Sequence, residues 1–249
     1  MRHKLGIKPY HQFSKSGREL RRSLGLARYN SNHTYDLLIN WGSQRDDGNA
    51  VRTVNKEVCI KNSSDKLRAF SLLKESNIRV PKHTVSMYEA KDFNYPVLCR
   101  LNNLMGGNGI HVALTPNDLV KADFYVEYIT PITEFRVHVF ENEIIAWSKK
   151  IPKSVNSDKY IRNHAKGYKF SLCENGRIYS KLKEYAIESI KCLKLDFGAV
   201  DIILSENHKF FVLEVNTAIG VEGTVLRNYA NKIKEVAYYG WKRIFIYKF

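Results

Sequence analysis

The chain has 249 residues, of which 44% are hydrophobic and 26% charged, so its composition is that of a globular protein that can bury a core without disulfides. Its net charge of +15 favours polyanionic partners such as nucleotides, nucleic acids or acidic peptides. No stretch approaches the roughly 18 apolar residues of a membrane-spanning helix, the start lacks the apolar segment of a signal peptide, and the four cysteines lack zinc-ligand spacing, so we expect a cytoplasmic protein with free thiols and no membrane partner.

The first 60 residues predict a small α/β unit of strand, helix and strand. Ser16 and Glu19 have capping-box spacing, which predicts a helix over 17–26. Residues 35–40 (YDLLIN) predict a strand, whereas 43–56 are polar and predict a loop. The first 28 residues are the most basic part of the chain, with eight Lys or Arg and a single acid.

The remaining chain, 61–249, alternates predicted helices and strands. Ser64 is expected to cap a helix in which Leu67, Phe70 and Leu73 follow helical spacing. Further predicted elements, in chain order, are strands at 95–100 and 124–129, a hairpin of 135–140 with 144–149, a helix at 178–193, strands at 198–204 and 210–216, and a final helix from 225. Mixed helices and antiparallel hairpins indicate an α+β (mixed α/β) fold.

The strongest chemical signal lies in DIILSENHKFFVLEVN, near the carboxyl end. A four-residue turn over 206–209 would place Asp201 directly opposite Glu214, and side chains so paired lie about 5 Å apart. Asn216 shares a strand face with Glu214. Two carboxylates and a carboxamide form a hard oxygen site that suits Mg²⁺. A turn one residue longer or shorter would break this pairing, and an ordinary solvent-facing hairpin is the alternative.

A glycine-rich turn follows the strand at 95–100. Gly106, Gly107 and Gly109 would let backbone N–H groups approach a phosphate closely, although such glycines also mark any tight turn. Arg100 at the base of the turn and Lys66 near the start of its helix could supply positive charge. The sequence has neither a Walker motif nor a dinucleotide-binding fingerprint.

The strand at 124–129 ends in Glu127, Tyr128 and Ile129. The backbone of these residues could form hydrogen bonds with the edge of an adenine. Glu134 and Arg136 share one face of the next strand. A turn over 141–143 would place Glu134 opposite Lys150 and Arg136 opposite Ser148. A contact with a nucleotide and a cross-strand salt bridge are therefore equally good interpretations of Glu134.

These motifs, in this order, resemble the ATP-grasp superfamily, and the similarity is greatest to carboxylate–amine ligases such as the ribosomal-protein glutamate ligase. The segments that carry the resemblance are DKLRAFSLLKESNIRVP, YPVLCR with GGNGI, VEYI with EFRVHVF, IRNHAKG, and DFGAVDIILSENHKFFVLEVNTAIGVEGT. The resemblance spans about residues 60–230. It implies two α+β subdomains that clasp ATP, with a lid near 83–125, preceded by a small domain over 1–60.

The resemblance also implies roles for the candidate residues. Lys66 and Arg100 would contact the phosphates, Glu127 to Ile129 the adenine, and Glu134 the ribose. Arg162 and Asn163 would lie near the transferred phosphate, with Arg162 and Arg136 as catalytic residues. The implied metal ligands are Asp201, Glu214 and Asn216, which would bind one or two Mg²⁺, with Mn²⁺ as a substitute.

Two positions depart from the family pattern. The second phosphate lysine is Arg100 here, which keeps the charge but changes its geometry. Ile219 stands where a proline is usual, and we expect this to loosen the loop beside the acceptor substrate.

The resulting hypothesis is a ligase that uses ATP and Mg²⁺ to join a carboxylate to the amine of an amino acid, peptide or protein through an acyl phosphate. Two alternatives remain. The charge and the 12% aromatic residues also suit a nucleic-acid-binding module, and a non-catalytic ATP-grasp domain would bind nucleotide alone.

Overall fold

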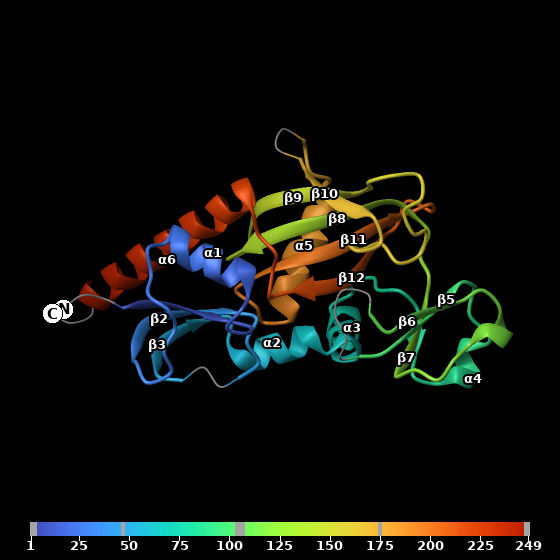
Figure 1. Cartoon of the computed structure of the whole chain (residues 1–249), viewed down its shortest axis with the longest axis horizontal. Helices are drawn as coiled ribbons and strands as arrows, with labels where there is room; N and C mark the ends of the chain where they lie inside the picture. The colour runs from blue at the N-terminus through green and yellow to red at the C-terminus, as the bar shows by residue number, and fades with distance from the viewer. Residues whose placement is uncertain (1–3, 46–47, 103–107, 174–175, 247–249) are drawn as a thin grey trace.

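The structure, a computed structural model, describes residues 4–45, 48–102, 108–173 and 176–246, with 239–246 described by backbone alone. Three sheets lie side by side, and the five-stranded sheet lies between the other two (Figure 1). Helices and strands mix as the sequence predicts, so the α+β class is confirmed. No helix in the described ranges is long and apolar enough to cross a membrane.

The N-terminal unit is a parallel three-stranded sheet with one helix. Its elements are β1 (Leu5–Pro9), α1 (Lys15–Ser23), β2 (Tyr35–Trp41) and β3 (Ala50–Val54). The prediction of a loop over 43–56 is wrong, because residues 50–54 form β3. This edge strand (AVRTV) has two adjacent exposed residues, Val51 and Arg52, and so lacks the alternation of a half-buried strand. Ser14 rather than Ser16 caps α1: its Oγ accepts from Gly17 N at 3.2 Å, while Ser16 Oγ accepts from Trp41 Nε1.

Two helices link this unit to the rest of the chain, α2 (Glu57–Ser64) and α3 (Lys66–Glu75). The expected cap, Ser64, is instead the last residue of α2. Asp65 caps α3, since its Oδ1 accepts from Arg68 N at 3.2 Å. The domain boundary predicted at residue 60 falls inside α2.

A small antiparallel sheet occupies the region of the predicted lid. Its strand order is β4-β7-β5-β6, and its elements are β4 (His83–Thr84), α4 (Met87–Ala90), β5 (Val97–Arg100), β6 (Ile110–Ala113), η1 (Pro116–Asp118) and β7 (Phe124–Glu127). It has a separate core that includes Phe93, Val97 and Tyr125. The sheet is therefore a unit of its own, and its movement as a lid stays a prediction.

The central sheet is antiparallel with the order β10-β9-β8-β11-β12. Its strands are β8 (Pro131–Phe140), β9 (Glu143–Pro152), β10 (Tyr168–Leu172), β11 (Phe197–Ser205) and β12 (Phe210–Asn216). Helices α2, α3 and α5 (Ser180–Cys192) contribute to the core on one face, where they meet Val137, Val200 and Val212. The opposite face carries the polar side chains described below.

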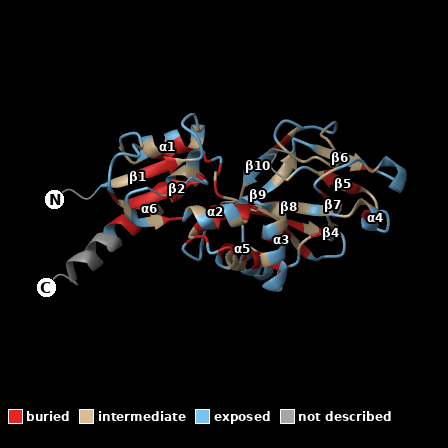
Figure 2. Cartoon of the chain, turned by 90° about the horizontal axis from the view of Figure 1, so that it is seen from below, coloured by how far each residue is buried: buried red, intermediate tan, exposed pale blue. Residues whose placement is uncertain are grey.

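The last helix, α6 (Gly223–Ile246), joins the N-terminal unit to the central sheet. Trp41 of β2 stacks on Phe197 at 5.1 Å between ring centroids and meets Tyr229 of α6 edge-on at the same distance. All three rings are fully buried, and Figure 2 shows the buried positions that run through β1, β2 and α6. This shared core fixes the N-terminal unit against one end of the central sheet.

Candidate active site

Asp201 of β11 and Glu214 of β12 are direct partners in the sheet, as the sequence predicts. The turn between the strands is one residue longer than expected, because the last pair is Leu204 with Phe210. A β-bulge between Asp201 and Ile202 absorbs the extra residue, since Ile202 pairs with Val212 and Asp201 with Glu214. The pairing is therefore confirmed although the expected turn is wrong.

The same bulge assigns the faces of β12. Strict alternation along 210–216 predicts an apolar face of Phe211, Leu213 and Val215, with Val212 on the face of Glu214. The structure buries Val215 as expected, but Val212 lies in the core in place of Phe211 and Leu213. Without the bulge, Glu214 would lie on the face of Val212 and point into the core. With it, Glu214 lies on the polar face, where Asn216 Nδ2 donates to its Oε1 at 3.0 Å.

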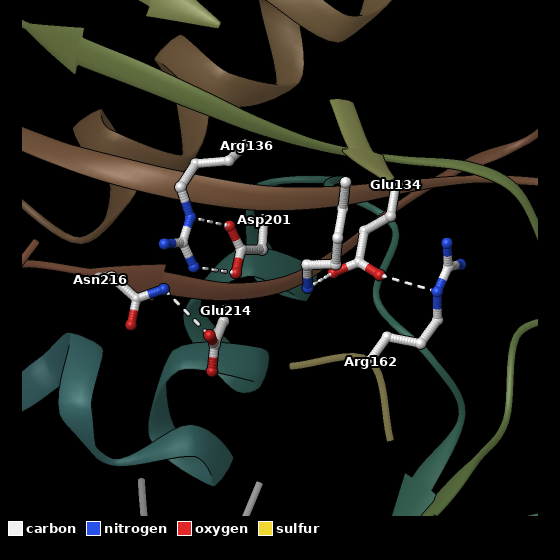
Figure 3. Close-up of polar contacts among 7 residues, drawn as sticks. Glu134, Arg136, Arg162, Asp201, Glu214 and Asn216 are labelled. Carbon is white, nitrogen blue, oxygen red and sulfur yellow. Dashed lines mark hydrogen bonds and ion pairs between the residues drawn. The ribbon is translucent and has the colours of Figure 1, made fainter. Parts of the chain in front are cut away.

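Arg136 of β8 binds Asp201 from the other side. Its Nε and one terminal nitrogen each donate to a carboxylate oxygen at 2.7 Å, a bidentate geometry seen in Figure 3. Asp201 is only 2% exposed. Burial opposes its ionisation most strongly, but the attraction and hydrogen bonds of Arg136 outweigh burial and keep the pKa of Asp201 below its ordinary value.

Glu134 lies two residues before Arg136 on the same face and is also buried. Lys150 of β9 donates to its Oε1, and Arg162 Nε approaches its Oε2 at 3.7 Å (Figure 3). Lys150 is its direct cross-strand partner, as predicted. Burial raises the pKa of Glu134 while Lys150 opposes the rise. The structure thus realises the salt-bridge interpretation, with Arg162 as a second cation.

Lys66 at the start of α3 and Arg100 in β5 of the small sheet both lie close enough to Glu214 to interact with its charge. Burial lowers the pKa of both, Arg100 lowers that of Lys66 further, and the Glu214 carboxylate opposes the shift of each. Lys66 Nζ donates to the backbone oxygen of Asn102 at 3.0 Å. Arg100 Nε is buried and has no hydrogen-bond partner within the described part of the chain, and the same is true of Arg162 Nε.

The predicted adenine segment begins at Glu127, the last residue of β7. Tyr128 donates its hydroxyl to Lys159 O at 2.9 Å and contacts the ring of Tyr160, which ties this segment to the loop that carries Arg162. Burial raises the pKa of Tyr128 to about 12. Glu127 accepts from Asn94 Nδ2 at 2.9 Å, and Ile129 is half-buried. Glu127 to Ile129 thus lie in the chain just before β8, the strand that carries Glu134 and Arg136.

The remaining predicted residues are those of the glycine-rich turn and Asn163. Gly109 has a φ of +69°, a conformation that favours glycine, and its oxygen accepts from Leu101 N at 3.2 Å. Gly106 and Gly107 lie outside the described residues. Asn163 Oδ1 accepts from Lys166 N at 2.8 Å, so this side chain helps to close its own turn.

Ile219 is not part of a loosened loop. It is 1% exposed and packs in the core that contains Trp41 and Tyr229. Nearby, a Cβ on Gly42 would lie 2.5 Å from Ala218 Cβ, so the N-terminal unit closely abuts this segment. The expectation that Ile219 loosens the loop is wrong. Proline would restrict the backbone here, and the buried Ile219 side chain instead holds the segment by packing in the core.

Two residues that contact the predicted site residues, Asn102 and Phe170, were not predicted from the sequence. Asn102 binds the start of α3 through Lys66 and Asp65. Phe170 of β10 places its ring 4.2 Å from the guanidinium carbon of Arg136. The alternation of Tyr168, Phe170 and Leu172 with polar residues was the signal for Phe170, and nothing in the sequence singles out Asn102.

The sequence matches the RimK-like ATP-grasp domain over residues 63–237, more than half of the chain. The chain belongs to the RimK-like ATP-grasp family. It is 22% identical over 191 residues to the coenzyme gamma-F420-2:alpha-L-glutamate ligase of Methanococcus maripaludis, covering 68% of this chain and 64% of that protein. It is 29% identical over 195 residues to a probable alpha-L-glutamate ligase of Stutzerimonas stutzeri, covering 70% and 62%. The chain thus spans less than two thirds of these relatives' lengths.

Solved structures share the ATP-grasp fold. The ATP-grasp ligase PsnB in complex with a minimal precursor aligns with a TM-score of 0.71 at 11% identity, over 94% of this chain and 99% of that one. The D-alanine–D-alanine ligase of Bacillus anthracis aligns with a TM-score of 0.69 at 13% identity, over 94% and 93%. The predicted ATP-grasp architecture is therefore confirmed.

The residues of this ATP-grasp domain fit a magnesium–nucleotide complex. In the described ranges no three His, Cys, Asp or Glu side chains gather as a metal cluster. A metal at Asp201 and Glu214 would therefore need Asn216, water and phosphate oxygens as further ligands, which is the coordination Mg²⁺ usually adopts. Arg100 and Arg162 suit the phosphates, because neither buried Nε has a hydrogen-bond partner in the described part of the chain, although Arg162 Nε lies 3.7 Å from the Glu134 carboxylate.

Proposed function

We propose that the chain is an ATP- and Mg²⁺-dependent carboxylate–amine ligase that forms an amide bond through an acyl phosphate and releases ADP and phosphate. The observation that carries this proposal is the direct pairing of Asp201 with Glu214. Carboxylates on directly opposed residues of an antiparallel pair repel each other, and a cation bound between them offsets that repulsion. Two cations that a phosphate would need, Lys66 and Arg100, lie near enough to Glu214 for its charge to act on both.

Each group has a role in this scheme. Asp201, Glu214 and Asn216 would hold Mg²⁺, which when bound neutralises phosphate charge. Lys66 and Arg100 would bind the phosphates, and Glu127 to Ile129 the adenine.

The carboxylate substrate attacks the γ-phosphate, and its oxygen forms the new P–O bond as the bond to ADP breaks. Arg162 would stabilise the charge that develops on the transferred group. The amine then attacks the acyl carbon, loses a proton and expels phosphate. Positioning and electrostatics supply most of the catalysis in phosphoryl transfer.

Glu134 needs a different interpretation from the ribose contact that the resemblance implies. Its carboxylate is buried between Lys150 and Arg162. We propose that it positions Arg162 and accepts a ribose hydroxyl only if nucleotide binding draws one of these cations away.

The substrates are proposed only by class. The named relatives include alpha-L-glutamate ligases and a D-alanine–D-alanine ligase. An amino acid or peptide with a free amine is therefore the first acceptor to examine, and an amino acid carboxylate the first donor.

The test is ADP release by the purified chain with ATP and Mg²⁺, measured against a panel of amino acids and peptides. We expect one acid–amine pair to stimulate ADP release and to yield an amide product detectable by mass. Arg162→Ala should lower turnover about 100-fold or more while ATP binding persists. Normal turnover in this variant would remove Arg162 from the chemistry.

The net charge supports one rival, a nucleic-acid-binding module. That reading predicts tight RNA or DNA binding that weakens steeply with salt, without ATP binding. This outcome, together with no ADP release from any pair, would replace the ligase proposal.

A further inference from the structure

Strand β10 places aromatic rings over the cations of the polar face. Its register is antiparallel to β9, with Phe170 opposite Lys150 and Leu172 opposite Ser148. Tyr168 and Phe170 are two residues apart and share a face. The Tyr168 ring lies 5.0 Å from the guanidinium carbon of Arg162, and the Phe170 ring lies 4.2 Å from that of Arg136 and 5.3 Å from Lys150 Nζ.

The contact between Phe170 and Arg136 crosses an intervening strand. Arg136 is on β8, and its neighbour on β9 is Ser148, a small side chain that is 4% exposed. A larger residue there would occupy the space between β8 and β10. The aromatic ring can therefore reach over Ser148, while Phe170 itself remains 39% exposed on the edge strand.

We propose that Phe170 is a positioning residue that holds the Arg136 guanidinium on Asp201 and so fixes the orientation of that carboxylate. The Arg136 side chain is 19% exposed, and its nitrogens bind both oxygens of Asp201. The negative face of an aromatic ring attracts a cation, and the attraction grows when the pair is shielded from water.

The consequence concerns the lone pairs of Asp201. Bidentate binding by Arg136 fixes the carboxylate plane, so the lone pairs left over for another ligand have a set direction beside Glu214. Losing the ring would free the guanidinium to turn, and the carboxylate would lose its fixed direction. Preorganised ligands bind a metal more tightly than mobile ones, so the effect should appear in the Mg²⁺ dependence of nucleotide binding.

The effect of Phe170 on Mg²⁺ binding rests on the proposed function, whereas the contact between Phe170 and Arg136 does not. Two measurements test the effect and the contact separately. The first is the NMR signal of the Arg136 Nε–H, assigned by its loss in Arg136→Lys, which the hydrogen bond to Asp201 should protect from exchange. In Phe170→Leu we expect this signal to shift and to exchange at least about fivefold faster, because the ring contact is lost.

The second measurement is calorimetric ATP binding as a function of Mg²⁺ concentration. We expect Phe170→Leu to raise the half-saturating Mg²⁺ concentration about fivefold. Phe170→Tyr keeps the ring and should restore both readouts. Phe13→Leu, which changes a ring that is 74% exposed in the N-terminal unit, is the matched control and should behave as the unaltered chain.

The outcomes are distinct. An unchanged Nε–H signal in Phe170→Leu overturns the positioning role, as does equal loss in the Leu and Tyr variants, which would indicate packing alone. A changed signal with unchanged Mg²⁺ dependence overturns the link to Asp201 as a ligand. Failure of the unaltered chain to bind ATP overturns the proposed function and, with it, the effect on Mg²⁺ binding, while the Nε–H readout still decides the contact.

Discussion

Arg136 and Asp201 form a bidentate ion pair on adjacent strands, with both hydrogen bonds at 2.7 Å and Asp201 almost fully buried. Removing one partner of such a pair leaves an uncompensated charge in the protein interior. The pair is therefore a structural requirement as well as a candidate part of the active site.

The first prediction follows from this pair. Arg136→Met should lower the free energy of unfolding by about 3 kcal/mol, measured by urea denaturation at pH 7. The matched control is Arg52→Met, which breaks an exposed ion pair. The side chains of Arg52 and its partner Glu141 are each 46% exposed. That exposed pair should contribute less than about 1 kcal/mol. Equal losses in both variants would contradict a special role for the buried pair.

A second prediction concerns pH and the buried His138. Burial, with Arg136 adding to it, lowers the pKa of His138 to about 3. The unfolded chain binds the proton near pH 6.5, so between these values it holds more protons than the folded chain, and acidification favours unfolding. Through His138, each unit by which the pH falls between about pH 6 and 4 should therefore lower the free energy of unfolding by about 1.4 kcal/mol.

The check is the free energy of unfolding at several pH values in that interval. His138→Gln should reduce the slope by about 1.4 kcal/mol per pH unit, whatever its effect at neutral pH. The exposed His33→Gln should retain the slope of the unaltered chain. A His138→Gln slope that matches the unaltered chain would show that His138 titrates normally.

The third prediction concerns Ile219, which anchors the segment after β12. Ile219→Ala should lower the free energy of unfolding by about 3 kcal/mol, since a fully buried aliphatic side chain leaves a cavity. Val155→Ala, at a position 99% exposed, should change it by less than about 0.5 kcal/mol. A small effect of Ile219→Ala would mean that the segment is held by other contacts.

A fourth prediction tests the base of the glycine-rich turn. Asn102 accepts from Lys66 N at 3.2 Å and donates to Asp65 at 3.2 Å, so its side chain connects the turn to the start of α3. Asn102→Ala should weaken ATP binding about tenfold, as loss of supporting contacts around a binding group typically does. Asn32→Ala, at an exposed position in the N-terminal unit, should leave the affinity unchanged.

The sequence predicted cross-strand pairs better than turns. Both candidate hairpins were given turns wrong by one residue, yet Asp201 faces Glu214 and Glu134 faces Lys150 as expected. In each hairpin a bulge restores the register, next to Ile202 in one and between His138 and Val139 in the other. A bulge depends on packing of the whole sheet, so alternation along one strand could not reveal it.

Other features depend on contacts that sequence spacing does not encode. Strand β3 is an edge strand with exposed residues, and the ring of Phe170 meets Arg136 across an intervening strand. The order of strands in the sheet decides that contact. Local patterns thus predicted the acids on β11 and β12, whereas their cationic surroundings required the three-dimensional arrangement.

The most direct test of the account is a calorimetric titration of ATP into the purified chain, with Mg²⁺ and with EDTA. We expect binding that Mg²⁺ strengthens, and loss of that strengthening in Glu214→Gln, which keeps the shape of the side chain but removes its charge. Glu206→Gln, an exposed acid in the neighbouring turn, should retain it. Equal ATP affinity with Mg²⁺ and EDTA, or full Mg²⁺ dependence in Glu214→Gln, would contradict a magnesium–nucleotide site at Asp201, Glu214 and Asn216.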